Sequence, residues 1–117
     1  MIRFKIAQMI GAIEALEGYL ESITYQMQTM DPLAQAIELG GAMAILKYQT
    51  TRNMTLVSDN ACQIFGGRAL TATGMGKAVE NLQRTFKFAS ILGGSEEIMA
   101  DLGVRQALMS WPVDAKM

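Results

Sequence analysis

The sequence of 117 residues predicts an all-α protein, a helical bundle with up-down topology. Apolar residues recur every three or four positions over long segments, which is the spacing of one face of a helix. Glycine pairs and a proline interrupt this spacing where helices should end, and no segment alternates as a β-strand does. Packing the apolar faces together gives a bundle, which we expect to form a single helical domain over residues 1–117.

The first predicted helix covers residues 2–30. A 4-3-4-3 spacing places its apolar residues on one stripe of a helix about 43 Å long at 1.5 Å per residue. These residues are Ile2, Ile6, Met9, Ile13, Leu16, Leu20, Ile23, Met27 and Met30. Small residues from Ala7 to Ser22 form a row beside the stripe, which a neighbouring helix can approach closely. Glu14, Glu17 and Glu21 mark the expected solvent side.

A second helix is expected from Pro32 to Phe65. Asp31 suits the N-cap, and Pro32 suits the first helical position, where its missing N–H is not needed. The middle of this helix, from Thr50 to Asn60, is unusually rich in Thr, Ser, Asn and Asp. The pattern leaves three interpretations open: a solvated face, a short break, or a surface that hydrogen-bonds to another group.

A third helix should follow the glycine pair Gly66-Gly67. Glycine readily takes the left-handed conformation that ends a helix, and residues 68–76 are expected to form a loop. The third helix then carries an apolar stripe with the same spacing, made of Met75, Val79, Leu82, Phe86 and Ala89.

A fourth helix should begin after Gly93-Gly94. Ser95 is a good N-cap, and acidic residues in the next turn complement the positive end of the helix dipole. Ile98, Leu102 and Leu108 give this helix its apolar positions, and Pro112 is expected to end it.

Composition excludes several classes of function. Half of the residues are hydrophobic, which suggests that some apolar surface meets another chain or domain. A net charge of −1 without a basic stripe argues against nucleic-acid binding, and no apolar run reaches the ~20 residues of a membrane span. The absence of histidine removes His-based nucleophile systems and the usual zinc and di-iron sites, so no metal is expected. The single cysteine, Cys62, excludes an internal disulfide and suits a reducing, intracellular compartment.

Two glycine-bearing segments carry the functional signal. Gln63-Ile64-Phe65-Gly66-Gly67 ends the second helix, and Gly93-Gly94-Ser95-Glu96-Glu97-Ile98 begins the fourth. Glycines let a ligand approach the backbone, and the first turn of a helix offers free N–H groups, although each segment alone is more often a capping signal. In this order, and with the helix start Ile6-Ala7-Gln8-Met9, they resemble the C-terminal helical domain of the acyl-CoA dehydrogenase family, which carries QIFGG and then a Glu-Gly-Thr segment.

The resemblance implies an FAD-dependent oxidoreductase of fatty acid metabolism that oxidises the Cα–Cβ bond of an acyl-CoA thioester. Hydrogen bonds to the thioester carbonyl stabilise the developing enolate in such a reaction, and the family's backbone donor matches Gly93, next to Gly94. The same resemblance implies that the FAD of a neighbouring subunit contacts Gln63, Ile64, Phe65, Gly66 and Gly67. It also implies that the FAD of the same subunit contacts Ser95, Glu96 and Glu97. A homo-oligomer and an electron-transfer partner are also implied.

The chain departs from the family at the catalytic base. The commonest base is the glutamate of the Glu-Gly-Thr segment, and Gly93 stands in its place, so no catalytic residue is expected in this chain. Glu96 and Glu97 match later positions and are expected to be ordinary first-turn residues. The family's first helical domain, its β-domain and the first helix of its bundle would all precede Met1. The chain alone is therefore expected to be inactive and to retain no FAD.

A non-catalytic alternative is a self-associating helical interaction module. A bundle without its first helix exposes an apolar groove, and ten methionines suit an adaptable contact surface, although filling a core is the commoner role of such residues. A membrane-surface role for the first helix is disfavoured by its acidic polar face. The expected location is the cytoplasm of a bacterium, or the mitochondrial matrix or peroxisome of a eukaryote.

Overall fold

The computed structural model describes residues 1–110, and every regular element in this range is helical. The elements in chain order are α1 (Ile2–Thr29), α2 (Pro32–Phe65), the short 3-10 helices η1 (Gly66–Leu70) and η2 (Gly74–Gly76), α3 (Lys77–Ile91) and α4 (Glu96–Ser110). The all-α prediction is confirmed, and the helix bounds agree closely with those expected. The expected loop at 68–76 is instead mostly 3-10 helix, and Pro112 lies outside the described residues.

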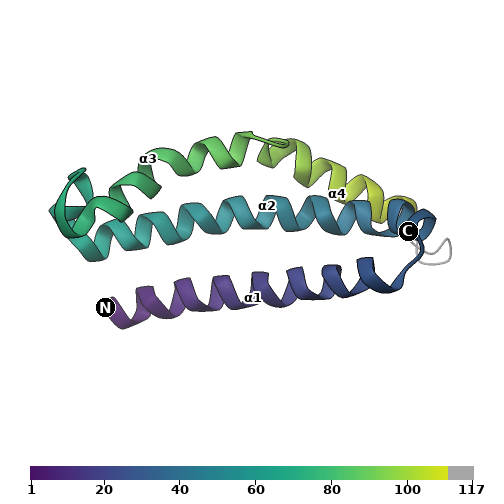
Figure 1. The fold of residues 1–117 in the computed structure, drawn as a ribbon, viewed down its shortest axis with the longest axis horizontal. Coiled ribbons are helices and arrows are strands. Elements are labelled where there is room, and N and C mark those ends of the chain that lie inside the picture. Colours follow the sequence, from purple (N-terminus) through teal and green to yellow (C-terminus); the bar gives the residue numbers. More distant parts are fainter. Residues whose placement is uncertain (111–117) are drawn as a thin grey trace.

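The helices form three rows, and α2 is the middle row, antiparallel to the row on either side (Figure 1). α1 packs along one side of α2, whereas α3 and α4 follow one another along the opposite side. The chain reverses after α1 and again after α2, which confirms the up-down topology. The radius of gyration is 17.6 Å, against about 13 Å for a compact domain of this length. The molecule is therefore long and thin.

The turn between α1 and α2 is fixed by side chains. The Asp31 carboxylate accepts hydrogen bonds from the backbone N–H groups of Leu33 and Ala34, at 3.0 and 3.1 Å. The Gln35 amide donates to the carbonyl of Met30 at 2.9 Å. The predicted N-cap is thus confirmed, and Gln35 of α2 also binds the carbonyl of Met27 in the last turn of α1, at 2.8 Å.

The polar middle of α2 is a packing surface in an unbroken helix. On the α1 side, the Asn53 amide donates to the Ala12 carbonyl, and the Lys5 ammonium donates to the Asn60 side chain, both at 2.9 Å. Thr51 is buried, and its hydroxyl donates to carbonyls of the preceding turn of α2. Of the three interpretations left open by the sequence, the hydrogen-bonding surface is the one observed.

The same stretch of α2 also binds α3. Ser58 is fully buried, and its hydroxyl donates to the Gln83 amide oxygen. Lys47 donates to the carbonyl of Ala89 in the last turn of α3 at 2.6 Å, where a cation complements the helix dipole. Each polar contact replaces water that burial removed, so the two helices are held in one register.

Glycines allow α2 and α4 to cross closely. Gly41 and Gly103 are both buried at the crossing. A Cβ added at Gly41 would lie 3.0 Å from the Gln106 Cβ and 3.3 Å from the Gly103 carbonyl oxygen. The close approach therefore depends on the missing side chain at this position.

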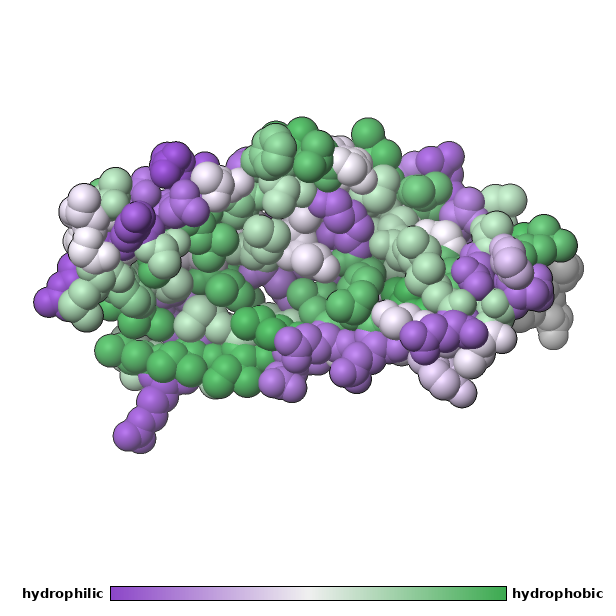
Figure 2. All heavy atoms as spheres, in the orientation of Figure 1, coloured by the Kyte–Doolittle hydropathy of each residue, from purple (hydrophilic) through white to green (hydrophobic). Residues whose placement is uncertain are grey.

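Much apolar surface remains exposed. The accessible surface is 8359 Å², about 2,000 Å² more than the roughly 6,300 Å² expected for a compact monomer of this mass. The predicted stripe of α1 is only partly covered: Ile23 is buried, while Ile13 and Leu20 are exposed. Figure 2 shows apolar residues at the surface along the N-terminal half of α1. Ile98 and Leu108 of α4 are exposed as well.

The row of small residues on α1 has no neighbour within residues 1–110. Added Cβ atoms at Gly11 and Gly18 would meet no atom within 4 Å. The sequence predicted that a helix can approach this row, and no described helix does so. Across the same range, no helix has the length and apolar character needed to cross a lipid bilayer.

Candidate functional site

The first glycine-bearing segment lies where α2 ends (Figure 1). Gln63, Ile64 and Phe65 form the last turn of α2, and Phe65 keeps 38% of its surface exposed. Gly66 has a φ of +60°, and its N–H donates to the Cys62 carbonyl, so the predicted glycine end is confirmed. Its ψ of −144° is not that of a left-handed helix, and η1 begins directly afterwards.

The turns after this segment pack tightly on one another. Gly76 is buried, and a Cβ there would overlap the carbonyl group of Arg68. The Thr71 hydroxyl donates to the Arg68 carbonyl at 2.9 Å and to the Thr73 carbonyl at 3.1 Å. Ala69 is also buried, at 1% exposure. We call this region, residues 63–76, the glycine corner of α2. Its backbone is held by contacts between η1 and η2.

Two shallow cavities adjoin the glycine corner of α2. One, of about 240 Å³, is lined by Asp59, Cys62, Gln63, Gly66, Ala69 and Leu70. The other, of about 400 Å³, is lined by Met1, Ile2, Lys5, Gln63 and Ile64. Lys5 therefore shares a cavity with two predicted cofactor residues, Gln63 and Ile64, although nothing in the sequence predicted it as a site residue. No local motif marks Lys5, because its place depends on how α1 packs against the end of α2.

The second glycine-bearing segment joins α3 to α4. Gly93 and Gly94 have φ values of +73° and +108°, which residues with a Cβ rarely adopt. A Cβ at Gly93 would meet no atom within 4 Å, so its backbone is open to a ligand. Gly94 is half-buried, and a Cβ there would overlap the Met99 side chain. We call residues 93–97 the α3–α4 junction.

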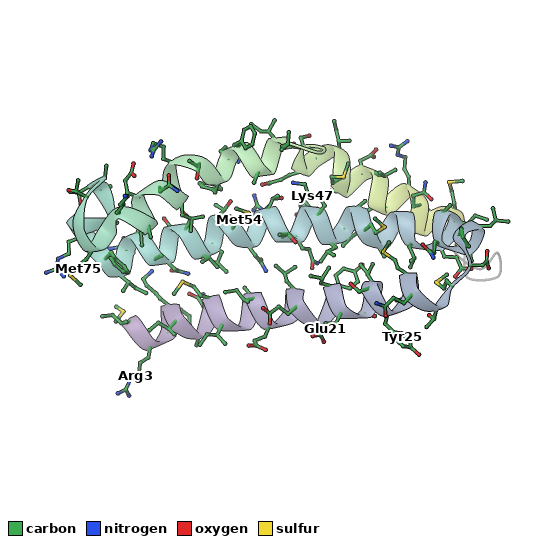
Figure 3. All side chains as sticks on the ribbon, in the orientation of Figure 1. Arg3, Glu21, Tyr25, Lys47, Met54 and Met75 are labelled. Carbon is green, nitrogen blue, oxygen red and sulfur yellow. The ribbon has the colours of Figure 1, made fainter. Side chains whose placement is uncertain are left out.

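Cations on α2 hold the α3–α4 junction in place. Arg52 forms an ion pair of 3.5 Å with Glu96, whose side chain is only 12% exposed. The Oε1 atom of Glu96 is buried and has no hydrogen-bond partner among residues 1–110. Lys47 reaches from α2 towards the same region, as Figure 3 shows, and binds the Ala89 carbonyl. Glu96 thus links two helices, beyond the first-turn role expected for it.

Glu97 is exposed at the start of α4. Its own backbone N–H, and next the Ser95 hydroxyl, stabilise the carboxylate and lower the pKa of Glu97 below its ordinary value. Lys87 and Arg52 lower this pKa further by their charge, and partial desolvation opposes them. Ser95 is half-buried next to it. A carboxylate with a lowered pKa is a weaker proton acceptor than an ordinary one.

The structure does not bring the two segments together within one chain. The glycine corner of α2 and the α3–α4 junction lie at opposite ends of α3, which spans about 22 Å at 1.5 Å per residue. The family resemblance implies that the two segments contact flavins of different subunits, so their separation within one chain agrees with that expectation. Within residues 1–110, no group of three acidic, cysteine or histidine side chains is placed to hold a metal ion.

Comparison with known proteins gives a consistent family. The family model described as acyl-CoA dehydrogenase, C-terminal domain, matches residues 1–108. The chain is similar to acyl-CoA dehydrogenase apdG of Emericella nidulans, with 27% identity over 116 residues, covering 99% of this chain and 26% of that protein. It is also similar to acyl-CoA dehydrogenase AFT10-1 of Alternaria alternata, with 36% identity over 107 residues, covering 90% of this chain and 25% of that protein. The chain therefore spans about a quarter of these relatives. No solved structure matches it.

Proposed function

The chain belongs to the acyl-CoA dehydrogenase family, as its C-terminal domain, and from this premise we propose that it supplies part of the flavin and acyl-CoA sites of an FAD-dependent dehydrogenase. The observation that carries the proposal is the open backbone at Gly66 and Gly93, where positive φ angles and empty space beside each glycine admit a ligand. Both glycines lie in the segments that resemble the family's flavin and substrate segments.

The chemistry of the glycine corner of α2 suits a flavin. The Phe65 ring is partly exposed, and added Cβ atoms at Gly66 and Gly67 would meet nothing within 4 Å. A flat ring system can therefore lie against this backbone. Gln63 and Ile64, in the last turn of α2, would then border the ring. Exposed Gln63 offers an amide that both donates and accepts hydrogen bonds.

The α3–α4 junction suits a different part of the cofactor. Glu96 and Glu97 place two carboxylates at the start of α4. Carboxylates repel a diphosphate, whereas they accept hydrogen bonds from hydroxyl and ring N–H groups. In the proposed site, Ser95, Glu96 and Glu97 therefore bind a neutral part of FAD.

FAD held by residues 63–67 and 95–97 would supply the hydride acceptor for oxidation at the β-carbon of the acyl chain. The residues of this chain act on the thioester: the backbone N–H of Gly93, which is open to a ligand, donates to its carbonyl oxygen, and Gly94 leaves room for the Met99 side chain that packs beneath the turn. The α-proton needs a base from outside this chain, because Glu96 pairs with Arg52 and the pKa of Glu97 is lowered. The chain alone is accordingly inactive and retains no FAD.

The proposed enzyme is a homo-oligomer, because the two segments of one chain contact flavins of different subunits. An acyl-CoA thioester is its substrate, and an electron-transfer partner reoxidises the flavin. Its proposed location is intracellular, in the cytoplasm of a bacterium or in the mitochondrial matrix or peroxisome of a eukaryote. The single cysteine without a disulfide supports this location.

A complementation experiment tests the flavin site. The 117-residue chain is co-expressed with the Alternaria alternata relative from which the matching quarter has been deleted. We expect the two parts to co-purify with flavin absorbance, and we expect Gly66→Val and Phe65→Ser to lower the flavin content. Gly40→Val is the matched control, because an added Cβ at Gly40 meets nothing within 4 Å and the residue lies far from the corner.

Two results would contradict the proposal. A purified complex without flavin would contradict the proposed flavin site. So would a flavin content that Gly66→Val and Phe65→Ser leave unchanged. Separately, FAD that stays bound to the isolated chain through gel filtration would show that the chain holds more than part of the site.

A second candidate function is the self-associating interaction module. The observation that favours it is the exposed apolar surface of α1, where Ile6, Ile13 and Leu20 each keep more than 40% of their surface exposed. Analytical ultracentrifugation of the isolated chain tests it, since a strict monomer at micromolar concentration would exclude self-association.

A further inference from the structure

Two cations of α2 hold the two ends of the α3–α4 junction. Lys47 donates to the Ala89 carbonyl in the last turn of α3 at 2.6 Å, and Arg52 pairs at 3.5 Å with Glu96, the first residue of α4. Arg52 follows Lys47 by five positions, which is about 7.5 Å along a helix. Because α2 is unbroken here, it sets the distance between the end of α3 and the start of α4.

The backbone between these two anchors is intrinsically flexible, because it contains two glycines. Gly93 and Gly94 have φ values of +73° and +108°, and glycine adopts negative φ values as readily. A Cβ at Gly93 would meet no atom within 4 Å, so close packing does not restrain this residue. The direction of the Gly93 N–H therefore depends on where α3 ends and where α4 begins.

The ion pair at the start of α4 differs from an ordinary surface pair. The side chain of Arg52 is 61% exposed but that of Glu96 only 12%, and Glu96 Oε1 is buried with no hydrogen-bond partner among residues 1–110. Exposed pairs contribute little to stability, whereas a mostly buried carboxylate that loses its cation is left uncompensated. Removal of Arg52 should therefore drive Glu96 towards water, and the first turn of α4 with it.

We propose that Arg52 is a positioning residue for the proposed oxidation of an acyl-CoA thioester. Through Glu96 it holds the first turn of α4, and this turn keeps the Gly93 N–H in the direction needed to donate to the thioester carbonyl. A donor that is fixed in advance costs no reorganisation when negative charge develops on the carbonyl oxygen. The inference rests on the proposed contact of Gly93 with the thioester, and this role of Glu96 is separate from its proposed contact with FAD.

NMR of the labelled full chain, without flavin, tests the effect on the backbone. The wild-type Gly93 N–H is expected to have an order parameter of about 0.85, and Arg52→Met should lower it to about 0.6 or less. The Met99 N–H donates to the Ser95 carbonyl at 2.9 Å in the first turn of α4. This amide should exchange with solvent roughly 5- to 150-fold faster in Arg52→Met, which keeps the apolar part of the side chain.

Two further variants separate positioning from general stability. Arg105→Met is the matched control, because it removes the ion pair of Arg105 with Asp101 on the same helix, where both side chains are exposed. It should leave both readouts at their wild-type values. Arg52→Met/Glu96→Gln should recover part of the order lost in Arg52→Met, because a neutral amide leaves no unpaired charge buried. Far-UV circular dichroism identifies any variant that has lost its helices.

Turnover links the junction to the proposed reaction. The assay uses the complex of this chain with the Alternaria alternata relative from which the matching quarter has been deleted, and a series of acyl-CoA thioesters. Arg52→Met should lower kcat between about tenfold and a hundredfold, because misdirecting an oxyanion donor costs less than removing it. KM should stay within about twofold of the wild type.

The outcomes separate the role of Arg52 from the function on which it rests. An unchanged Gly93 order parameter and Met99 exchange rate in Arg52→Met, even with a lower urea midpoint, would leave a merely structural contact and overturn the inference. A mobile Gly93 in the wild type, a double variant as mobile as Arg52→Met, or an unchanged kcat would overturn it too. A flavin-loaded complex that turns over no acyl-CoA contradicts the proposed function instead, whatever the NMR result.

Discussion

Replacing Gly76 with alanine should open the glycine corner of α2. Gly76 is buried where η2 meets η1, and a Cβ there would overlap the carbonyl group of Arg68 and lie 3.0 Å from the Ala69 nitrogen. These are backbone atoms, so no side-chain rotation can relieve the overlap. The 3-10 turns must move apart, which exposes Ala69 and disturbs the hydrogen bonds around Thr71.

The expected loss of stability follows from this geometry. Inserting one carbon into a packed contact costs about 1–3 kcal/mol, and a site walled by backbone belongs near the upper end. Such a loss lowers the ratio of folded to unfolded chain roughly 5- to 150-fold. Gly40→Ala is the matched control, because nothing lies within 4 Å of a Cβ added at Gly40, in the N-terminal third of α2. Removing a helical glycine there should stabilise the chain by about 0.5–1 kcal/mol.

Urea unfolding followed by circular dichroism measures both variants, and hydrogen exchange of residues 66–76 reports on the corner itself. Gly76→Ala should unfold at lower urea and exchange faster in this segment. Wild-type stability together with unchanged exchange in Gly76→Ala would refute the close backbone contact between η1 and η2. If Gly76→Ala is destabilised but the amides of residues 66–76 keep their protection from exchange, the loss of stability does not come from separation of η1 and η2.

Three further changes test other contacts. Lys5→Met leaves the buried Asn60 side chain without its donor and should cost about 1–3 kcal/mol in urea unfolding; an unchanged midpoint would mean that the bond to α1 contributes little. Gly41→Leu should force α2 away from α4 at Gly103 and lower the thermal midpoint, whereas a wild-type midpoint would exclude the glycine crossing. Glu97 has a lowered pKa in the folded chain, so its carboxylate contributes stability at neutral pH that is lost as the pH falls through that pKa. The difference in urea midpoint between wild type and Glu97→Gln should therefore shrink in acid, and a difference that grows in acid would reverse the assigned sign.

Local signals predicted the helices well. Asp31 followed by Pro32 marks the start of α2, and Gly66 marks its end, because capping depends on groups only a few residues apart. Gly93 and Gly94 were recognised as a break for the same reason, and their positive φ angles agree with it. Sequence patterns of this kind are sufficient wherever the deciding contacts lie within one turn of helix.

Contacts between helices were less predictable. The polar middle of α2 had three interpretations, and only the packing of α1 and α3 distinguished them, because Asn53 and Ser58 find their partners on other helices. Lys5 was missed as a neighbour of Gln63 for the same reason. The spacing of Ile13 and Leu20 showed that they share a face with Leu16, but not how much of that face α2 covers.

The sequence by itself determined that the chain is helical, where α2 begins and ends, and to which family it belongs. These properties follow from capping, periodicity and two short segments, all of which are local along the chain. The tertiary structure decided that α2 is central, that the two glycine-bearing segments stand a helix length apart, and that one face of α1 stays uncovered. Burial depends on which surfaces meet in space, and a one-dimensional pattern fixes the face of a helix without fixing its neighbour.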